Sequence, residues 1–174
     1  HNGRDCIVVL PTGGGKSLCY QAPAMANNGM AVVVSPLISL VKDQVDALVE
    51  NGVSAMRLDS SMSADEQTET LNYLQNGDVK LLYLSPERLL TEGMLTALKQ
   101  TKLAYFAIDE AHCVSMWGHD FRPEYRQLSR LRELFPDVPI AAYTATATGY
   151  QCHLVVNSHS SLRGTVLSRC TPSG

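Results

Sequence analysis

The chain has 174 residues, which is enough for one domain with its own hydrophobic core and too few for two large domains. Hydrophobic residues make up 45% and charged residues 18% of the sequence, as in ordinary soluble proteins that mix helices and strands. The formal net charge of −3 excludes an overall basic surface, so any binding of nucleic acid must depend on a local group of residues.

Cysteine spacing and hydropathy narrow the class further. Five cysteines are present without a C-x-x-C pair or a zinc-binding spacing, so we expect free thiols in a reducing compartment. No apolar run approaches about 18 residues and no signal peptide is visible, so we expect a cytoplasmic protein that does not contact a membrane. Because the chain starts at His1, shortly before a strand-like segment, we also expect an internal piece of a longer protein.

Six short apolar segments, each followed by a helical pattern, predict parallel strands that alternate with helices. The predicted strands are Cys6–Leu10, Ala31–Val34, Ala55–Leu58, Leu81–Leu84, Leu103–Ile108 and Ile140–Tyr143. Because these segments are apolar on both sides, the sheet should be covered by helices on both faces. The predicted fold is therefore a three-layer α/β domain with a mostly parallel sheet.

Apolar residues at helical spacing mark two of the helices between these strands. Their stripes consist of Leu37, Val41, Val45 and Leu48, and of Leu128, Leu131 and Leu134. Ser63 and Glu66 predict a capping box at the start of a third helix. After Gly149 the composition changes, because Tyr150–Gly174 is rich in Ser, His, Arg and Thr. We therefore expect one domain over residues 1–148 and a poorly specified tail over residues 149–174.

The junction after the first predicted strand has the composition of a phosphate-binding loop. In parallel sheets, ligands bind beyond the carboxyl ends of the strands. Consecutive glycines let backbone N–H groups turn inward around an anion, and the following helix adds its N-terminal dipole. A lysine then supplies positive charge for the β- and γ-phosphates, and a serine hydroxyl can bind Mg²⁺. The predicted nucleotide-binding residues are Thr12, Gly13, Gly14, Gly15, Lys16 and Ser17.

An acidic pair follows the fifth predicted strand, in the tetrapeptide Asp-Glu-Ala-His. Asp109, at the strand end, can hold Mg²⁺ through water, and Glu110 can polarise the attacking water in a phosphoryl transfer. An acidic turn exposed to solvent is the alternative explanation of this common tetrapeptide. We expect His112 to couple the site to its surroundings rather than to take part in the chemistry.

Ser-Pro junctions follow the second and fourth predicted strands, at Ser35 and Ser85. Serine at the cap and proline at the first helical position predict an abrupt helix start. A plain helix cap is one explanation of each junction. The other is that both helix N-termini receive nucleic-acid phosphates along the same edge of the sheet.

Two further segments complete the set of candidate residues. Thr144 and Thr146 follow the last predicted strand, where their hydroxyls could bond to the acidic pair and transmit the nucleotide state. The segment Val114–Tyr125 concentrates aromatic and basic side chains that could stack on unpaired bases or contact phosphates. A loop that anchors the core is the alternative for this segment. Its candidate DNA-binding residues are Trp117, His119, Phe121 and Arg122.

The motifs TGGGKS, SPLISLVKDQV, LSPERL, DEAH, SMWGHDFRPEY and TATAT occur in this order along the chain. In order and wording they resemble the first RecA-like motor domain of bacterial RecQ-family DNA helicases, over roughly Gly3–Thr148. The resemblance implies a RecA-like P-loop NTPase domain that binds ATP and Mg²⁺ through Lys16, Ser17 and Asp109. It also implies ATP-driven 3′-to-5′ unwinding, with single-stranded and partly duplex DNA as partner and a nucleoid-associated location in a bacterium.

Several family features are not found in this sequence. Leu10 stands where the strict phosphate-loop pattern has its first glycine, although helicases of the larger superfamilies commonly use a looser form. The upstream glutamine that reads adenine, the second RecA-like domain with its arginine finger, and the zinc-binding and winged-helix modules are missing. Two alternatives therefore stay open, namely a truncated nucleotide- or DNA-binding module without catalysis, and an RNA or chromatin translocase.

Overall fold

A computed structural model describes residues 5–11, 15–114, 122–145 and 165–168. The described strands form one sheet in the order β3-β4-β2-β5-β6-β1-β7, and all their pairings are parallel. The strands are β1 (Cys6–Val9), β2 (Met30–Val34), β3 (Ala55–Leu58), β4 (Leu81–Leu84), β5 (Leu103–Ile108), β6 (Ile140–Thr144) and β7 (Thr165–Ser168). All six predicted strands are confirmed, with ends that agree to within one residue.

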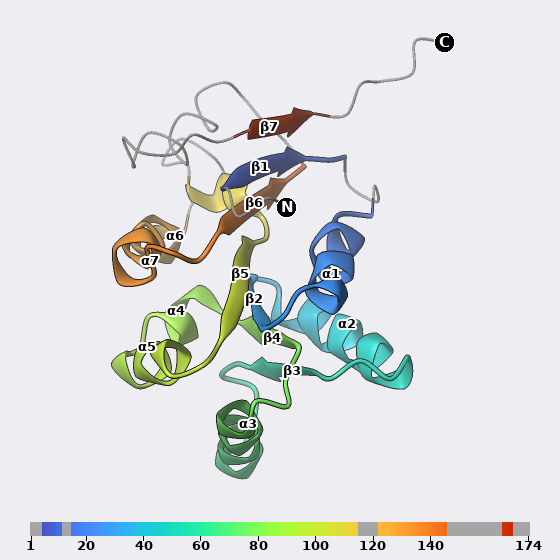
Figure 1. The fold of residues 1–174 in the computed structure, drawn as a ribbon, viewed down its shortest axis with the longest axis vertical. Helices are drawn as coiled ribbons and strands as arrows, with labels where there is room; N and C mark the ends of the chain where they lie inside the picture. Colours follow the sequence, from blue (N-terminus) through green and yellow to red (C-terminus); the bar gives the residue numbers. More distant parts are fainter. Residues whose placement is uncertain (1–4, 12–14, 115–121, 146–164, 169–174) are drawn as a thin grey trace.

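Helices cover the sheet on both sides, so the three-layer α/β architecture is confirmed (Figure 1). Helices α1 (Lys16–Ala26) and α2 (Ile38–Glu50) lie on one side. The other side carries α3 (Ala64–Asn76), α4 (Pro86–Leu89), α5 (Glu92–Lys99), α6 (Pro123–Gln127) and α7 (Arg130–Leu134). A short 3₁₀ helix, η1 (Ala111–Val114), follows β5. None of the described helices is long and apolar enough to cross a bilayer.

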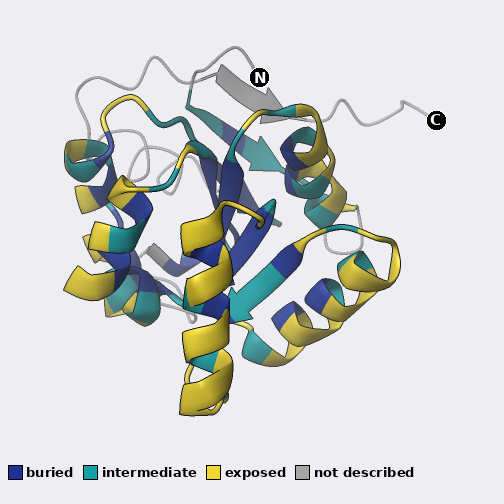
Figure 2. Cartoon of the chain, turned by 60° about the horizontal axis from the view of Figure 1, so that its bottom comes forward, coloured by how far each residue is buried: buried dark blue, intermediate teal, exposed yellow. Residues whose placement is uncertain are grey.

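The core has two halves, one on each face of the sheet, because side chains alternate along every strand. In the fully buried strand β2, Val32 and Val34 face α3–α7, whereas Ala31 and Val33 face α1 and α2. Burial of one such side chain stabilises the fold by about 1.5–3 kcal/mol. Figure 2 shows buried strands at the centre and helices whose outer surfaces are exposed.

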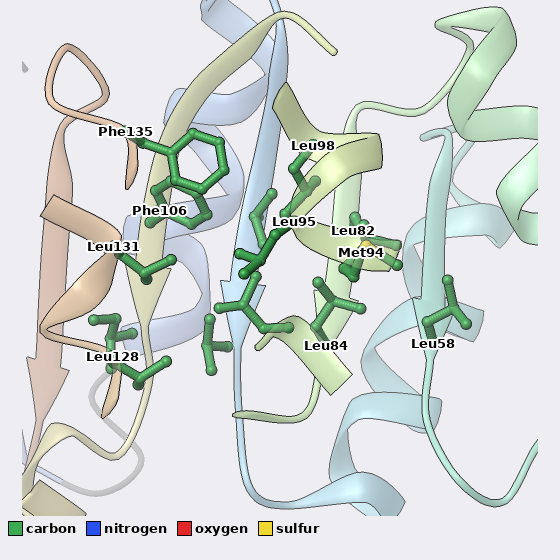
Figure 3. Close-up of a cluster of buried hydrophobic side chains, with 14 of the residues drawn as sticks. Leu58, Leu82, Leu84, Met94, Leu95, Leu98, Phe106, Leu128, Leu131 and Phe135 are labelled. Atoms are coloured by element: carbon green, nitrogen blue, oxygen red, sulfur yellow. The ribbon is translucent and has the colours of Figure 1, made fainter. Parts of the chain in front are cut away.

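On the α3–α7 face, leucines and aromatic residues fill the space between sheet and helices (Figure 3). The rings of Phe106 in β5 and Phe135 after α7 lie 5.2 Å apart and tilted by 57°. Leu95 and Leu98 of α5 and Leu131 of α7 are almost completely buried against the strands. This packing holds β5 in the centre of the sheet, so the end of β5, where the acidic pair follows, has a fixed position.

The structure confirms two of the predicted helix starts and corrects a third. Ser63 and Glu66 form the predicted capping box, and the Ser85 hydroxyl accepts a hydrogen bond from Arg88 N at the start of α4. The prediction that Ser35 caps a helix is wrong, because α2 starts at Ile38 and its N-cap is Leu37. The reason lies in the sheet: Ser35 N donates to the carbonyl oxygen of Leu84 at 3.0 Å, so Ser35 still belongs to the strand ladder.

Two other segments differ from the elements predicted from the sequence. The stripe Leu128, Leu131 and Leu134 does not belong to one helix, because Leu128 is the C-cap of α6 and only Leu131 and Leu134 lie in α7. Strand β7 lies in the tail, where no strand was predicted, and pairs with β1 from Cys6↔Thr165 to Val9↔Ser168. The first strand of the chain therefore lies between β6 and β7 rather than at an edge.

Candidate active site

The candidate residues lie in a row because parallel strands end at one edge of the sheet. Backbone hydrogen bonds continue past the strand ends and keep this edge in register: Asp109 N donates to Val34 O at 2.8 Å, and Ser35 N donates to Leu84 O at 3.0 Å. On the other side, Leu10 N donates to Thr144 O at 3.0 Å. The start of the phosphate loop, Thr144, Asp109, Ser35 and Ser85 therefore share one edge, as the sequence predicted.

Within the part of the chain that the structure describes, no side chain caps the N-terminus of the helix that follows the phosphate loop. Its N-cap is Gly15 in the left-handed conformation (φ 74°, ψ 29°), which glycine adopts without strain. Gly15 provides no side-chain cap, and the first turn of α1 contains no acidic residue. The N–H groups and the positive end of the helix dipole are therefore left for an anion. The predicted ligand residues Thr12, Gly13 and Gly14 lie outside the described residues.

Lys16 and Glu110 meet at the centre of the site, although 94 positions separate them in the sequence. Lys16 Nζ lies 3.3 Å from Glu110 Oε1, and both side chains are mostly buried. Glu110 has a positive φ of 52°, a conformation that costs an L-residue about 1–2 kcal/mol. This backbone turn follows β5 directly. The phosphate-loop lysine and the acidic pair, which the sequence suggested separately, therefore belong to one site.

Asp109 is a buried carboxylate, with 5% of its surface exposed. Its Oδ1 accepts a hydrogen bond from Glu110 N at 2.9 Å. Burial raises the pKa of Asp109 above its usual value, and the neighbouring charge of Glu110 raises it further. A divalent cation would relieve both effects, because it compensates lost hydration and repulsion between carboxylates. The chemistry of this carboxylate therefore fits Mg²⁺, with Ser17 in the first turn of α1 as the second predicted ligand.

A chain of contacts joins the acidic pair to the end of β6. His112 Nδ1 lies 3.2 Å from Glu110 Oε2, and the same ring nitrogen lies 3.3 Å from Thr144 Oγ1. The sequence suggested that threonine hydroxyls bond to the carboxylates themselves. In the structure the Thr144 hydroxyl contacts His112, which in turn contacts Glu110. The other predicted coupling residue, Thr146, lies outside the described residues.

The aromatic segment joins the site at its two ends. Arg122 N donates to Cys113 O at 2.9 Å, and the Tyr125 hydroxyl donates to Asp109 O at 2.8 Å. Burial raises the pKa of Tyr125, which keeps this hydroxyl protonated as a donor. The predicted DNA-binding residues Trp117, His119 and Phe121 lie outside the described residues, whereas the Arg122 side chain is exposed.

Tyr125 belongs to the aromatic segment that the sequence pointed to, but its hydrogen bond to Asp109 was not predicted. A tyrosine two positions after Pro123 lies in the first turn of α6 and can reach back toward β5. Ser35 and Ser85, the other predicted DNA-binding residues, use their hydroxyls as acceptors for the N–H groups of Leu37 and Arg88. Ser35 is buried, so its side chain contributes to the turn after β2.

Comparison with known families decides what kind of domain carries this site. Residues 1–154 match the family model described as DEAD/DEAH box helicase, which covers most of the chain. The chain belongs to the DEAD/DEAH box helicase family. Within the helicases it is 54% identical over 146 residues to ATP-dependent DNA helicase RecQ of Haemophilus influenzae, and 52% identical over 146 residues to the RecQ helicase of Bacillus subtilis. The resemblance inferred from the motifs is thereby confirmed.

These alignments cover most of the helicase domain and a small part of each relative. The match covers 84% of this chain and 24% of the Haemophilus influenzae protein, and 83% of this chain and 25% of the Bacillus subtilis protein. The chain therefore spans about a quarter of the length of these curated relatives. The aligned part corresponds to the motor region that contains the phosphate loop and the acidic pair.

Solved structures share the fold at much lower sequence identity. The helicase MrfA bound to DNA and AMPPNP superposes with a TM-score of 0.72 at 18% identity, over 96% of this chain and 25% of that chain. The helicase domain of Hef from Pyrococcus furiosus superposes with a TM-score of 0.70 at 19% identity, over 98% of this chain and 36% of that chain. The RecA-like fold class of this helicase domain is thus confirmed.

Proposed function

We propose that this domain is the ATP-binding half of a RecQ-type DNA helicase motor, which couples ATP hydrolysis to 3′-to-5′ movement along single-stranded DNA. The observation that carries the proposal is the contact between Lys16 Nζ and Glu110 Oε1 at 3.3 Å. It brings a phosphate-binding lysine and a carboxylate that can activate water to one point on the sheet edge. Phosphoryl transfer needs both of these groups.

Competition for the Lys16 ammonium group links substrate binding to catalysis in this proposal. A γ-phosphate that binds Lys16 draws it away from Glu110, which then loses its ion-pair partner. Glu110 can accept a proton from a water molecule whose oxygen attacks the γ-phosphorus. The bond from that phosphorus to the bridging oxygen breaks, so that ADP and inorganic phosphate are released. The free N-terminus of α1 supports the proposal, because its N–H groups suit the phosphates.

Asp109 and Ser17 are the residues that would hold Mg²⁺ in this site. When held there, Mg²⁺ would supply positive charge that offsets the negative charge of the phosphates. Asp109 is held in place from two sides, since its N–H donates to Val34 O and its carbonyl oxygen accepts from the Tyr125 hydroxyl. Its backbone is therefore held before any ligand arrives, and its Oδ1 accepts a hydrogen bond from Glu110 N at 2.9 Å, which lowers the entropic cost of binding.

DNA is the proposed partner of the same edge. Ser35 follows β2, the strand next to β5, and Ser85 follows β4 on the other side of β2. Arg122 N donates to Cys113 O shortly after the acidic pair, and Trp117, His119 and Phe121 belong to the segment between Cys113 and Arg122. The bonds Arg122 N–Cys113 O and Tyr125 Oη–Asp109 O support a coupling of this segment to hydrolysis. His112, Thr144 and Thr146 would carry the signal from Glu110 to the end of β6.

The complete motor would require a second RecA-like domain, in keeping with the quarter of the relatives' length that this chain spans. That domain would add an arginine finger, a group worth about 10³–10⁵ in rate in related phosphoryl transfers. We further propose a cytoplasmic, nucleoid-associated location, since DNA is the partner. The resulting activity is ATP-driven unwinding of partly duplex DNA.

The decisive test is the ATPase rate of the full-length protein with and without single-stranded DNA. The Lys16→Ala variant removes one charged group from the transition state, so its DNA-stimulated rate should fall by about 100-fold or more. Lys42→Ala is a matched control, because Lys42 pairs with Asp46 on the exposed surface of α2. We expect the control to keep the wild-type rate. An undiminished rate in Lys16→Ala, measured in the presence of DNA, contradicts the proposed function.

A further inference from the structure

Helix α1, which follows the phosphate loop, contains a proline that interrupts its own hydrogen bonding. Pro23 lies inside the helix and has no N–H group. In a regular helix, the N–H of residue 23 would donate to the carbonyl oxygen four positions earlier, which belongs to Cys19. The Cys19 carbonyl oxygen therefore receives no hydrogen bond from position 23.

A tyrosine from the sheet supplies the missing donor. The Tyr143 hydroxyl donates to the Cys19 carbonyl oxygen at 3.3 Å, across 124 positions of sequence. The ring of Tyr143 is almost completely buried and meets Tyr20 of α1 edge-on, with centroids 5.2 Å apart and an interplanar angle of 75°. Burial raises the pKa of Tyr143, so that the hydroxyl keeps its proton. The bond therefore has a buried, protonated donor and an acceptor that receives no hydrogen bond from position 23.

The same helix is fixed to the neighbouring strand as well. The Tyr105 hydroxyl of β5 donates to the carbonyl oxygen of Tyr20, one residue after Cys19. Gln21 of α1 donates through Nε2 to the Tyr83 hydroxyl of β4 at 2.9 Å. These two contacts differ from that of Tyr143, because neither involves the carbonyl that Pro23 leaves without a helix partner. The Tyr143 hydroxyl thus takes the place of a backbone hydrogen bond, whereas the Tyr105 and Gln21 contacts are additional hydrogen bonds between α1 and the sheet.

The position of Tyr143 in the chain connects this hydrogen bond to the candidate nucleotide site. Tyr143 directly precedes Thr144, whose hydroxyl contacts His112, and His112 contacts Glu110. Glu110 contacts Lys16, which lies three residues before Cys19 in the same helix. The contacts therefore form a closed ring that starts from α1, passes through the acidic pair and the end of β6, and returns to α1.

We propose that Tyr143 is a positioning residue for ATP binding: by replacing the hydrogen bond that Pro23 removes, it holds the phosphate-loop helix in register with β6 and with Glu110. This inference rests on the proposed function for its ligand. Without the hydroxyl, the first turns of α1 gain freedom to shift against the sheet. ATP then binds less tightly, because binding has to restore the productive position of Lys16.

A double-mutant cycle in the full-length protein tests this replacement. Tyr143→Phe removes only the hydroxyl, and Pro23→Ala returns an N–H group that can donate to Cys19 O. The third variant combines both changes, and Tyr73→Phe on the exposed face of α3 is the control. Two quantities are measured for each protein: the thermal midpoint of unfolding, and the dissociation constant of a fluorescent ATP analogue with Mg²⁺. The KM for ATP and kcat are then determined with single-stranded DNA.

We expect Tyr143→Phe to weaken the binding of the analogue and raise the KM about three- to tenfold, the range for one lost hydrogen bond. The kcat should stay within about twofold, because the bound state restores the geometry. In the Pro23→Ala background the hydroxyl should no longer matter, so the double variant should bind ATP like Pro23→Ala alone. Tyr73→Phe should match the unaltered protein.

Several outcomes overturn the inference. One is an unchanged dissociation constant in Tyr143→Phe, and another is a loss of affinity that persists in the Pro23→Ala background. A fall in kcat at constant KM also contradicts a positioning role. If Tyr143→Phe does not fold, the double variant decides, since recovery of folding supports the replacement and continued unfolding refutes it. If the unaltered protein does not bind ATP, the proposed function fails. The thermal midpoints still test the inference in that case, because additive effects of Tyr143→Phe and Pro23→Ala would show that the hydroxyl does not replace the hydrogen bond removed by Pro23.

Discussion

At the scale of single residues, the site depends on backbone conformations that the amino-acid types alone do not predict. Glu110 is the described non-glycine residue with a positive φ, and this turn sends its carboxylate toward Lys16. The motif identified Lys16, Asp109 and Glu110 as candidates because their chemistry suits phosphates and Mg²⁺. The 3.3 Å contact and the ring nitrogen shared by Glu110 and Thr144 depend on backbone turns that no spacing rule encodes.

The raised pKa of Asp109 predicts that its ionised carboxylate, which the proposed function needs, lowers the stability of the folded protein. Because the folded pKa lies above the unfolded value, ionised Asp109 destabilises the fold at neutral pH, and this cost is absent at pH below the unfolded pKa. Asp109→Asn removes the buried charge and keeps an oxygen for Glu110 N. We expect a higher thermal midpoint at pH 7 and a smaller gain near pH 4.

The same substitution should abolish catalysis, since the carboxylate that would hold Mg²⁺ is lost. We expect the DNA-stimulated ATPase rate to fall by about 100-fold or more. Thermal unfolding followed by circular dichroism at the two pH values gives the stability, and phosphate release gives the rate. A variant that is less stable than wild type at pH 7 is inconsistent with this account of Asp109.

At the scale of helices and strands, hydrophobic patterning predicted the sheet well. Strands such as β2 and β4 are buried on both faces, so their apolar runs are continuous and their ends are sharp. Helix boundaries were harder to predict where tertiary contacts override local chemistry. Ser35 has the side chain of a cap, yet its N–H remains in the strand ladder with Leu84. The break between α6 and α7 has no helix-breaking residue to mark it.

The entry into β2 predicts a large difference between two glycine substitutions. Gly29 has φ 114°, and a Cβ at this position would lie 2.9 Å from Lys102 O, which also accepts the hydrogen bond from Met30 N. Gly52 has φ 78° with open space around it. We expect Gly29→Ala to lower the free energy of unfolding by about 3 kcal/mol and Gly52→Ala by about 1 kcal/mol. Urea unfolding with comparable m-values measures both, and equal effects would argue against a close approach of β2 and β5.

At the scale of the whole molecule, the domain holds the groups that we propose bind ATP, whereas the proposed motor needs a second domain. Sequence comparison covers about a quarter of the RecQ relatives, and the arginine finger expected from the resemblance belongs to a second domain. The motif order gave the family and the location of the site. It could not predict β7, because Thr165–Ser168 pairs with a strand at the opposite end of the sequence.

The isolated chain therefore offers a test of how binding and hydrolysis are divided. We expect it to bind Mg-ATP and to hydrolyse it at least about 10³-fold more slowly than the full-length protein with DNA, because a finger contributes about 10³–10⁵ in rate. Equilibrium binding of a fluorescent ATP analogue and single-turnover hydrolysis are the measurements. Hydrolysis by the chain at the full-length rate would show that no second domain is required, and an absence of binding would show that the site is incomplete.

The pairing of β1 with β6 has a consequence for how the protein is made. During translation, β1 and the phosphate loop are made before the other described strands, yet β1 pairs with β6, and Asp5 accepts its hydrogen bond from Ile140 N, 135 positions later. Strand β1 therefore cannot pair with β6 until more than 130 further residues have been made. The candidate nucleotide site therefore forms only after β6 has been made, so a nascent chain that stalls before β6 would contain the phosphate loop without the strand that pairs with β1.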